Sequence, residues 1–258
     1  MNSKRKLSDM LKVDIRRMLV SRLTYIMLAI ALICPVLILV MTTMMDGTTT
    51  VNPETGIETE IKAFDSVWQA ISSPSGAEMT MDLTGMCNIN LMYFAAAVWV
   101  CLFVSEDFRS GYAKNIFAIR PKKSDYVVSK TVTCLIGGAM LILCWLVGSL
   151  VGGAVASLPF DMMGANAINI LMCIISKIAL MAVFVPIALA ISVAAKHRSW
   201  LSICCSLGGG MLLFMMIPML TPLDAGIMNA VLCIAGGVMF SFGLGAASSL
   251  ILNKTSLV

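Results

Sequence analysis

The positive charges of this chain are gathered into clusters that are separated by long apolar stretches. All but Lys62 and Lys177 of the 18 Lys and Arg residues lie in these clusters. The stretches between them hold six segments of about 20 residues, the length that an α-helix needs to cross about 30 Å of hydrocarbon. The clusters occupy residues 4–22, 109–130 and 196–198 and position 254.

This arrangement predicts an all-α polytopic membrane protein and its orientation. An even number of crossings places both termini on one side, and the Lys/Arg bias of the short loops predicts that this side is the cytoplasm. Many acidic residues then fall outside. They are Asp46, Glu54, Glu58, Glu60, Asp65, Glu78, Asp82, Asp161 and Asp224.

The composition leaves no room for a separate soluble domain. The chain is 59% hydrophobic and 12% charged, with a mean hydropathy of +0.93, whereas soluble domains are about 25% charged. We therefore interpret residues 1–258 as a single transmembrane domain, whose longest polar stretch is an outer loop at 46–85. The nine Cys residues lie in or at the apolar stretches without a C-x-x-C pair. We therefore interpret these Cys residues as small apolar side chains and not as parts of a disulfide framework or a zinc site.

An amphipathic helix is predicted at residues 4–22, before the first span. Leu7, Met10, Leu11, Met18 and Leu19 recur at spacings of three and four, with cations elsewhere on the helix. Such a helix would lie in the headgroup plane and present cations to anionic lipid. The alternative is a disordered basic tail.

The six predicted spans include one with a small-residue stripe. Gly148, Gly152 and Ala156 recur at spacings of four, which allows two helices to approach closely. The spans are predicted at about 23–45, 86–105, 131–157, within 167–195, 200–219 and 227–252.

Catalytic motifs are absent from the sequence. It has no H-E-x-x-H, G-x-S-x-G or Walker A pattern, and its single His, His197, falls in a cytoplasmic loop. The one ionisable residue deep in a predicted span is Lys177. We expect it either to snorkel to the outer boundary or form a structural pair, or else to lie on a transport path. The 22 Met residues either line a path for varied amphipathic substrates or simply face lipid.

The segment between the second and third spans carries the most specific pattern. Residues 105–118 read SEDFRSGYAKNIFA, and SDYVVSK follows at 124–130. This pattern resembles the permease subunits of type-2 ABC exporters, and most closely the small bacterial permeases of bacitracin resistance and lantibiotic immunity. The order of parts is also similar. The chain differs at Tyr112, where that family commonly has Thr, and in the turn at 119–123.

The resemblance implies a permease without its motor. Residues 106–130 would then be the cytoplasmic coupling segment that docks on a separate ABC ATPase, where ATP and Mg would bind. This chain itself would need no cofactor or metal and would have no catalytic residue. The ATPase-coupling residues so implied are Glu106, Asp107, Arg109, Tyr112, Lys114, Asn115, Ile116 and Phe117. The alternative for this segment is a solvated basic loop that only sets topology.

The same resemblance implies a translocation path between two permeases, in the bacterial cytoplasmic membrane. The second permease would be another copy of this chain or a sister chain. The polar residues expected along the path are Thr24, Tyr25, Asn88, Asn90, Lys177, Ser202 and Ser206.

Three functions follow as hypotheses, none of which involves nucleic acid. The first is the transport subunit of an ATP-driven exporter of an amphipathic peptide, drug or lipid-like substrate, for which the acidic outer loop suits a cationic antimicrobial peptide. The second is a carrier or channel without ATP, for which only Lys177 could supply an essential intramembrane charge. The third is a non-transporting membrane sensor or assembly subunit.

Overall fold

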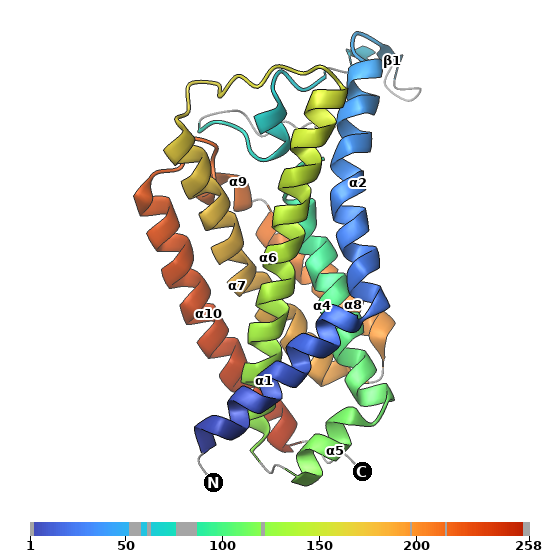
Figure 1. Cartoon of the computed structure of the whole chain (residues 1–258), viewed down its shortest axis with the longest axis vertical. Coiled ribbons are helices and arrows are strands. Elements are labelled where there is room, and N and C mark those ends of the chain that lie inside the picture. Colours follow the sequence, from blue (N-terminus) through green and yellow to red (C-terminus); the bar gives the residue numbers. More distant parts are fainter. Residues whose placement is uncertain are drawn as a thin grey trace.

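The protein is a bundle of long helices with a loop-rich cap at one end (Figure 1). The computed structural model describes residues 3–51, 58–60, 63–75, 87–119, 122–196, 198–214 and 216–254. The helices are α1 (Ser3–Val20), α2 (Arg22–Met44), α4 (Leu91–Arg109), α5 (Tyr112–Ile119), α6 (Lys123–Val155), α7 (Ala167–Ala195), α8 (Ser199–Phe214), α9 (Ile217–Leu220) and α10 (Ile227–Lys254). Helix α1 crosses the lower end of the bundle obliquely, and α5 lies beneath it, at the same end as both chain termini (Figure 1).

Five of the described helices are long and apolar enough to cross a membrane, namely α2, α4, α6, α7 and α10. The sixth predicted crossing, 200–219, is not one continuous helix. Helix α8 has 16 residues, about 24 Å at 1.5 Å per residue, and the four-residue helix α9 follows it. Pro218 explains the interruption, because it has no N–H to donate to the carbonyl of Phe214, where α8 ends. The count of six spans is therefore not confirmed.

The N-terminal segment is helical and does not form a loose tail. Met10, Asp14 and Met18 lie on the buried face of α1, while Val13, Leu19 and Val20 are exposed. An acid thus occupies the middle of the buried face, and the predicted amphipathic character of this helix is not confirmed. The third span also begins earlier than the predicted residue 131. Helix α6 starts at Lys123, so residues 123–130 belong to the long helix and not to a separate cytoplasmic segment.

The small-residue stripe on α6 forms the contact that its spacing predicts. A Cβ atom on Gly148 would lie 2.3 Å from the carbonyl oxygen of Leu32, and one on Gly152 would lie 2.8 Å from Cα of Val36. Helix α2 therefore packs directly against the backbone of α6. Gly237 plays the same part between α10 and α7, where a Cβ atom would lie 2.7 Å from the carbonyl oxygen of Ala179.

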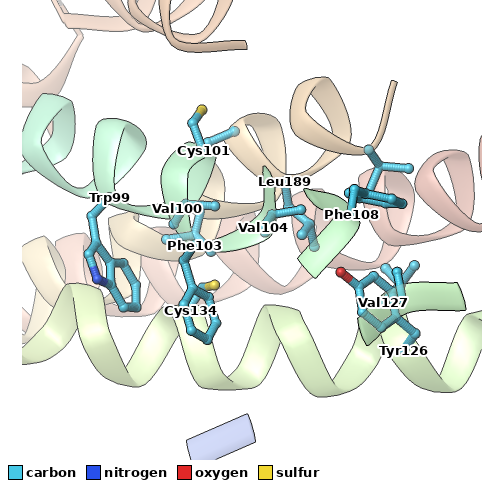
Figure 2. Packing of buried hydrophobic residues seen from close by; sticks show 14 of the residues in the cluster. Trp99, Val100, Cys101, Phe103, Val104, Phe108, Tyr126, Val127, Cys134 and Leu189 are labelled. Carbon is cyan, nitrogen blue, oxygen red and sulfur yellow. The ribbon is translucent and has the colours of Figure 1, made fainter. Parts of the chain in front are cut away.

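The largest apolar cluster joins α4 to α6 and α7. Figure 2 shows Trp99 and Phe103 of α4 pointing toward α6, where Cys134 lies. Trp99 and Phe103 stack with their ring centroids 5.5 Å apart. Gly137 leaves room for the Trp99 ring, because a Cβ atom there would lie 2.3 Å from it. The α4–α6 contact is thus fixed along its length by large side chains.

The cap is built from the outer loop and two short connections. Strands β1 (Thr49–Val51) and β2 (Glu58–Glu60) pair antiparallel, with Thr49 opposite Glu60. A single 3-10 turn, η1 (Val67–Ala70), follows. The Trp68 indole donates to the carbonyl of Phe160 at 3.2 Å, and the Trp145 indole donates to the carbonyl of Ala70 at 3.1 Å. These bonds hold the loop down on the ends of the bundle.

Candidate functional site

The predicted coupling segment, residues 106–130, contains a short helix between two long ones. Helix α4 ends at Arg109, and Gly111 follows with a φ of 75°. This left-handed conformation suits glycine at a helix C-terminus and allows the chain to turn sharply. Helix α5 then runs from Tyr112 to Ile119. The predicted helix between the second and third spans is thus present.

A buried ionic network lies between this segment and α1. Lys130 Nζ of α6 lies 2.9 Å from Asp14 Oδ1 of α1 and 2.7 Å from Asp107 Oδ2 of α4. All three side chains are completely buried. Removing one member of such a group typically costs about 3–5 kcal/mol, because it leaves an uncompensated buried charge. The three helices are therefore tied together at one point.

Neutral donors complete the coordination of both carboxylates. Ser129 donates to Asp14 Oδ2 at 2.6 Å, and Tyr126 donates to Asp107 Oδ2 at 2.9 Å. Arg17 Nη1 lies 2.8 Å from Asp107 Oδ1. Two acids and two bases thus balance, which meets the requirement that buried charges be paired.

Tyr112 joins α5 to the same network. Its hydroxyl donates to Asp14 Oδ1 at 3.2 Å, and the Arg17 guanidinium lies 3.7 Å from the centre of its ring. Burial and the charge of Asp14 raise the pKa of Tyr112 to about 12, against the opposing effect of Arg17. Burial opposes the charge of Arg17, but the combined effects of Asp107 and Tyr112 outweigh burial, so the pKa of Arg17 is raised. Both groups therefore stay protonated near neutral pH.

The eight predicted coupling residues separate into three groups. Lys114 and Asn115 are exposed on α5, and Glu106 and Arg109 are exposed at the end of α4. Tyr112, Ile116 and Phe117 are half-buried, and the latter two pack against the chain's own core. Asp107 has no exposed surface. Asp107 is therefore covered by contacts within the chain, whereas Tyr112, Ile116 and Phe117 keep part of their surface exposed. The docking role of these residues stays a prediction.

Comparison with known proteins identifies no relative. No protein family, curated protein or solved structure matches this chain. Its function has to be inferred from its residues and their geometry.

The predicted path residues do not meet in one place. Thr24 accepts a hydrogen bond from the Trp99 indole at 3.2 Å. Ser202 contacts Ser192 at 2.8 Å, and Ser206 contacts the Cys101 sulfur at 3.2 Å. Asn88 and Asn90 are buried at the start of α4, whereas Tyr25 is 61% exposed on α2. Within one copy of the chain, the buried members mainly join neighbouring helices.

Lys177 is fully buried near the cap. Its Nζ donates to Asn90 Oδ1 at 2.9 Å and to Thr221 Oγ1 at 3.0 Å. The carbonyl of Thr221 in turn accepts a hydrogen bond from Ser72 of the outer loop at 2.7 Å. The snorkelling position is therefore wrong, because the amine bonds inside the bundle. The structural-pair alternative agrees with these contacts, and the partners are neutral.

The sequence reasoning missed Asp14, Arg17, Tyr126, Ser129 and Lys130. The available signal was Asp14, because an acid four residues from both Met10 and Met18 interrupts the apolar face of an amphipathic helix. Such an acid needs a buried cation as its partner. Among the described residues, no group of three or more His, Cys, Asp or Glu side chains could hold a metal ion.

Proposed function

We propose that this chain is the permease subunit of an ATP-driven exporter whose ATP hydrolysis occurs on a separate ATPase chain. The observation that carries the proposal is the placement of α5. This short helix exposes Lys114 and Asn115 at one end of the bundle, while Tyr112 fixes it to the buried Asp14. A helix held in this way can receive a displacement from a partner on one face and pass it on from the other.

The buried network supplies the mechanical link. A movement of α5 pulls on Tyr112, whose partner Asp14 shares Lys130 with Asp107. Separating these charges is costly, so α1, α4 and α6 are expected to move with α5 as one unit. Packed elements with such discrete contacts switch between arrangements instead of deforming continuously. ATP-driven motion at α5 would then reach the spans.

We further propose that the bundle crosses a bacterial cytoplasmic membrane six times, with α8 and α9 together making one crossing. The starting end of α1 and the final end of α10 lie at the same end of the bundle (Figure 1), as an even number of crossings requires. The abundance of Lys and Arg at that end favours the cytoplasm. Helix α1 would lie in the headgroup plane.

Export would require a second permease, either another copy or a sister chain. The buried path residues of one copy bond to their own neighbours, so a substrate path is expected between copies. Tyr25 is the predicted path residue that faces outward on α2. A cationic amphipathic peptide is the proposed cargo, because Asp46, Asp65, Asp161 and Asp224 are exposed around the cap. Glu54, Glu78 and Asp82 lie outside the described residues, and Glu58 and Glu60 belong to β2.

A carrier without ATP is the second candidate, favoured by one observation. Lys177 is a buried cation, and intramembrane ionisable residues often mark ion or proton pathways. Its two neutral hydrogen-bond acceptors argue for a structural role instead. The third hypothesis, a non-transporting sensor or assembly subunit, has no specific observation in its favour.

Substitutions of the two exposed polar residues on α5 test the proposal. The Lys114→Glu and Asn115→Trp variants should each reduce co-purification with a candidate partner ABC ATPase, and reduce ATP-dependent uptake of a cationic peptide into inverted vesicles. The matched control is Lys254→Glu, which reverses an exposed charge at the end of α10. If both α5 variants bind the ATPase and transport like the control, α5 is not the docking helix.

A further inference from the structure

A cavity of about 320 Å³ opens beside the ionic network. Its walls come from three places, namely the bend between α1 and α2, the last two turns of α4 and the first residue of α8. The lining residues are Arg17, Ser21, Leu23, Leu102, Phe103, Glu106, Arg109 and Ser199. Its volume lies at the lower end of the range typical of small-molecule sites.

The polar side of this cavity carries both signs of charge. The Nη1 atom of Arg17 forms the ion pair with Asp107, and 30% of the Arg17 side chain remains exposed. Arg109 and Glu106 are both exposed, and in the described parts of the chain neither has an ion-pair partner within 4.0 Å. Guanidinium groups suit phosphate because they can donate two parallel hydrogen bonds. The carboxylate of Glu106 suits a group that carries N–H donors.

The remaining lining of the cavity is largely apolar and lies where the spans begin. Leu23 is in the first turn of α2, and Leu102 and Phe103 precede the charged end of α4. Trp200, beside the lining residue Ser199, is 68% exposed. Exposed Trp residues are typical of the membrane–water interface. A ligand that fits these walls has a charged head and an apolar continuation.

We propose that this cavity binds the headgroup of an aminophospholipid from the surrounding bilayer. Its phosphate would contact Arg109 and Arg17, and its primary ammonium would contact Glu106. Phosphatidylcholine presents a cation without an N–H donor, and phosphatidylglycerol presents no cation, so neither satisfies Glu106 and the arginines together. This inference rests on the proposed membrane crossing but not on ATP-driven export.

The test is competition for a fluorescent phosphatidylethanolamine on the purified full-length permease in detergent, without ATPase or ATP. Unlabelled phosphatidylethanolamine should compete about tenfold better than phosphatidylcholine, because a hydrogen bond to a charged group is worth about one tenfold step or more. Phosphatidylglycerol should also compete less well. Glu106→Gln should remove the preference over phosphatidylcholine, and Arg109→Gln should weaken all three lipids.

Controls separate this site from general charge and folding effects. Lys254→Gln removes an exposed cation outside the cavity and should bind like the unmodified chain. Leu102→Trp should fill the apolar side and weaken binding of every lipid, while a thermal melt of each variant reports folding. Equal competition by the three lipids, or a preference that survives in well-folded Glu106→Gln, would overturn the proposal.

Soluble phosphoethanolamine tests whether the apolar walls contribute. If phosphoethanolamine competed as strongly as intact phosphatidylethanolamine, the lipid assignment would also be overturned. Because the measurement omits ATPase and ATP, its result leaves the exporter proposal unaffected. Loss of ATPase docking in the α5 variants would in turn leave lipid preference unchanged.

Discussion

Lys130 Nζ of α6 lies 2.7 Å from Asp107 Oδ2 of α4, and neither side chain has any exposed surface. The same amine contacts Asp14 of α1 at 2.9 Å. One cation therefore joins three helices, at the end of the bundle where α5 lies.

The costs of replacing Lys130 and of replacing Asp107 are expected not to add. Lys130→Met leaves two carboxylates with reduced compensation, and Asp107→Asn leaves a cation with one acid fewer, so each should cost about 3–5 kcal/mol. The double variant should cost less than the sum of the two single variants, because the contact between Lys130 and Asp107 is then lost only once, although Asp14 loses its cation whenever Lys130 is replaced. Denaturant unfolding in detergent measures the cycle. Additive costs would show that the two side chains do not interact.

The close contact of α2 with α6 predicts a strong effect at one glycine and little at another. Gly148→Leu would force side-chain atoms into the Leu32 carbonyl and should cost several kcal/mol by overpacking. Gly208→Leu on α8 meets no atom within 4 Å and serves as the matched control. The thermal midpoint of each purified variant reports the difference. Similar midpoints for both variants would contradict the predicted packing.

Lys177→Met discriminates between a structural and a transporting lysine. Met fills a similar space without a charge, but it leaves the buried Asn90 side-chain oxygen without this donor, which costs at least about 1 kcal/mol. We expect stability within about 1–2 kcal/mol of the unmodified chain and ATP-dependent transport at matched expression. Thr221→Val, which removes one acceptor of the lysine, is a second variant. Loss of transport by a well-folded Lys177→Met protein would favour the carrier hypothesis.

The acidic outer loop is expected to concentrate cationic cargo by its local field. Neutralising Glu54, Glu58, Glu60 and Asp65 together should weaken resistance to cationic peptides, and more so at low salt because exposed charges are screened. Peptide sensitivity of cells at matched expression measures this, with sensitivity to a neutral peptide as the control. Unchanged sensitivity would remove cationic peptides as the proposed cargo.

The raised pKa of Tyr112, about 12 because of burial and Asp14, predicts a stability change in alkali. A group whose folded-state pKa exceeds its unfolded value near 10 stabilises fully below the unfolded value. This contribution is then lost as the pH rises toward the folded value. Between pH 10 and about 12, the thermal midpoint of the unmodified chain should therefore fall more steeply than that of Tyr112→Phe. Parallel curves would show that the Tyr112 hydroxyl is not held in the network.

The sequence predicts the long helices well because their signals are local. The lengths of the apolar stretches locate α2, α4, α6, α7 and α10, and small residues at spacings of four predict a close contact of α6 with another helix, which the structure identifies as α2. The broken crossing at α8 and α9 was missed, although Pro218 was visible. Pro35 and Pro186 are equally visible, yet they lie inside continuous helices. A proline therefore does not by itself decide between a break and an unbroken helix.

The sequence by itself determined the helical membrane class of this chain and the helix between two spans that carries Lys114 and Asn115. Only the tertiary structure decided which charged side chains form ion pairs inside the protein. Asp14, Asp107 and Lys130 are far apart in the chain, and they meet because of how α1 crosses α4 and α6. Lys177 likewise donates hydrogen bonds to Asn90 and Thr221, which lie far from it in the sequence. The reason is physical, since periodicity fixes which residues share a helix face, but only packing fixes which faces meet.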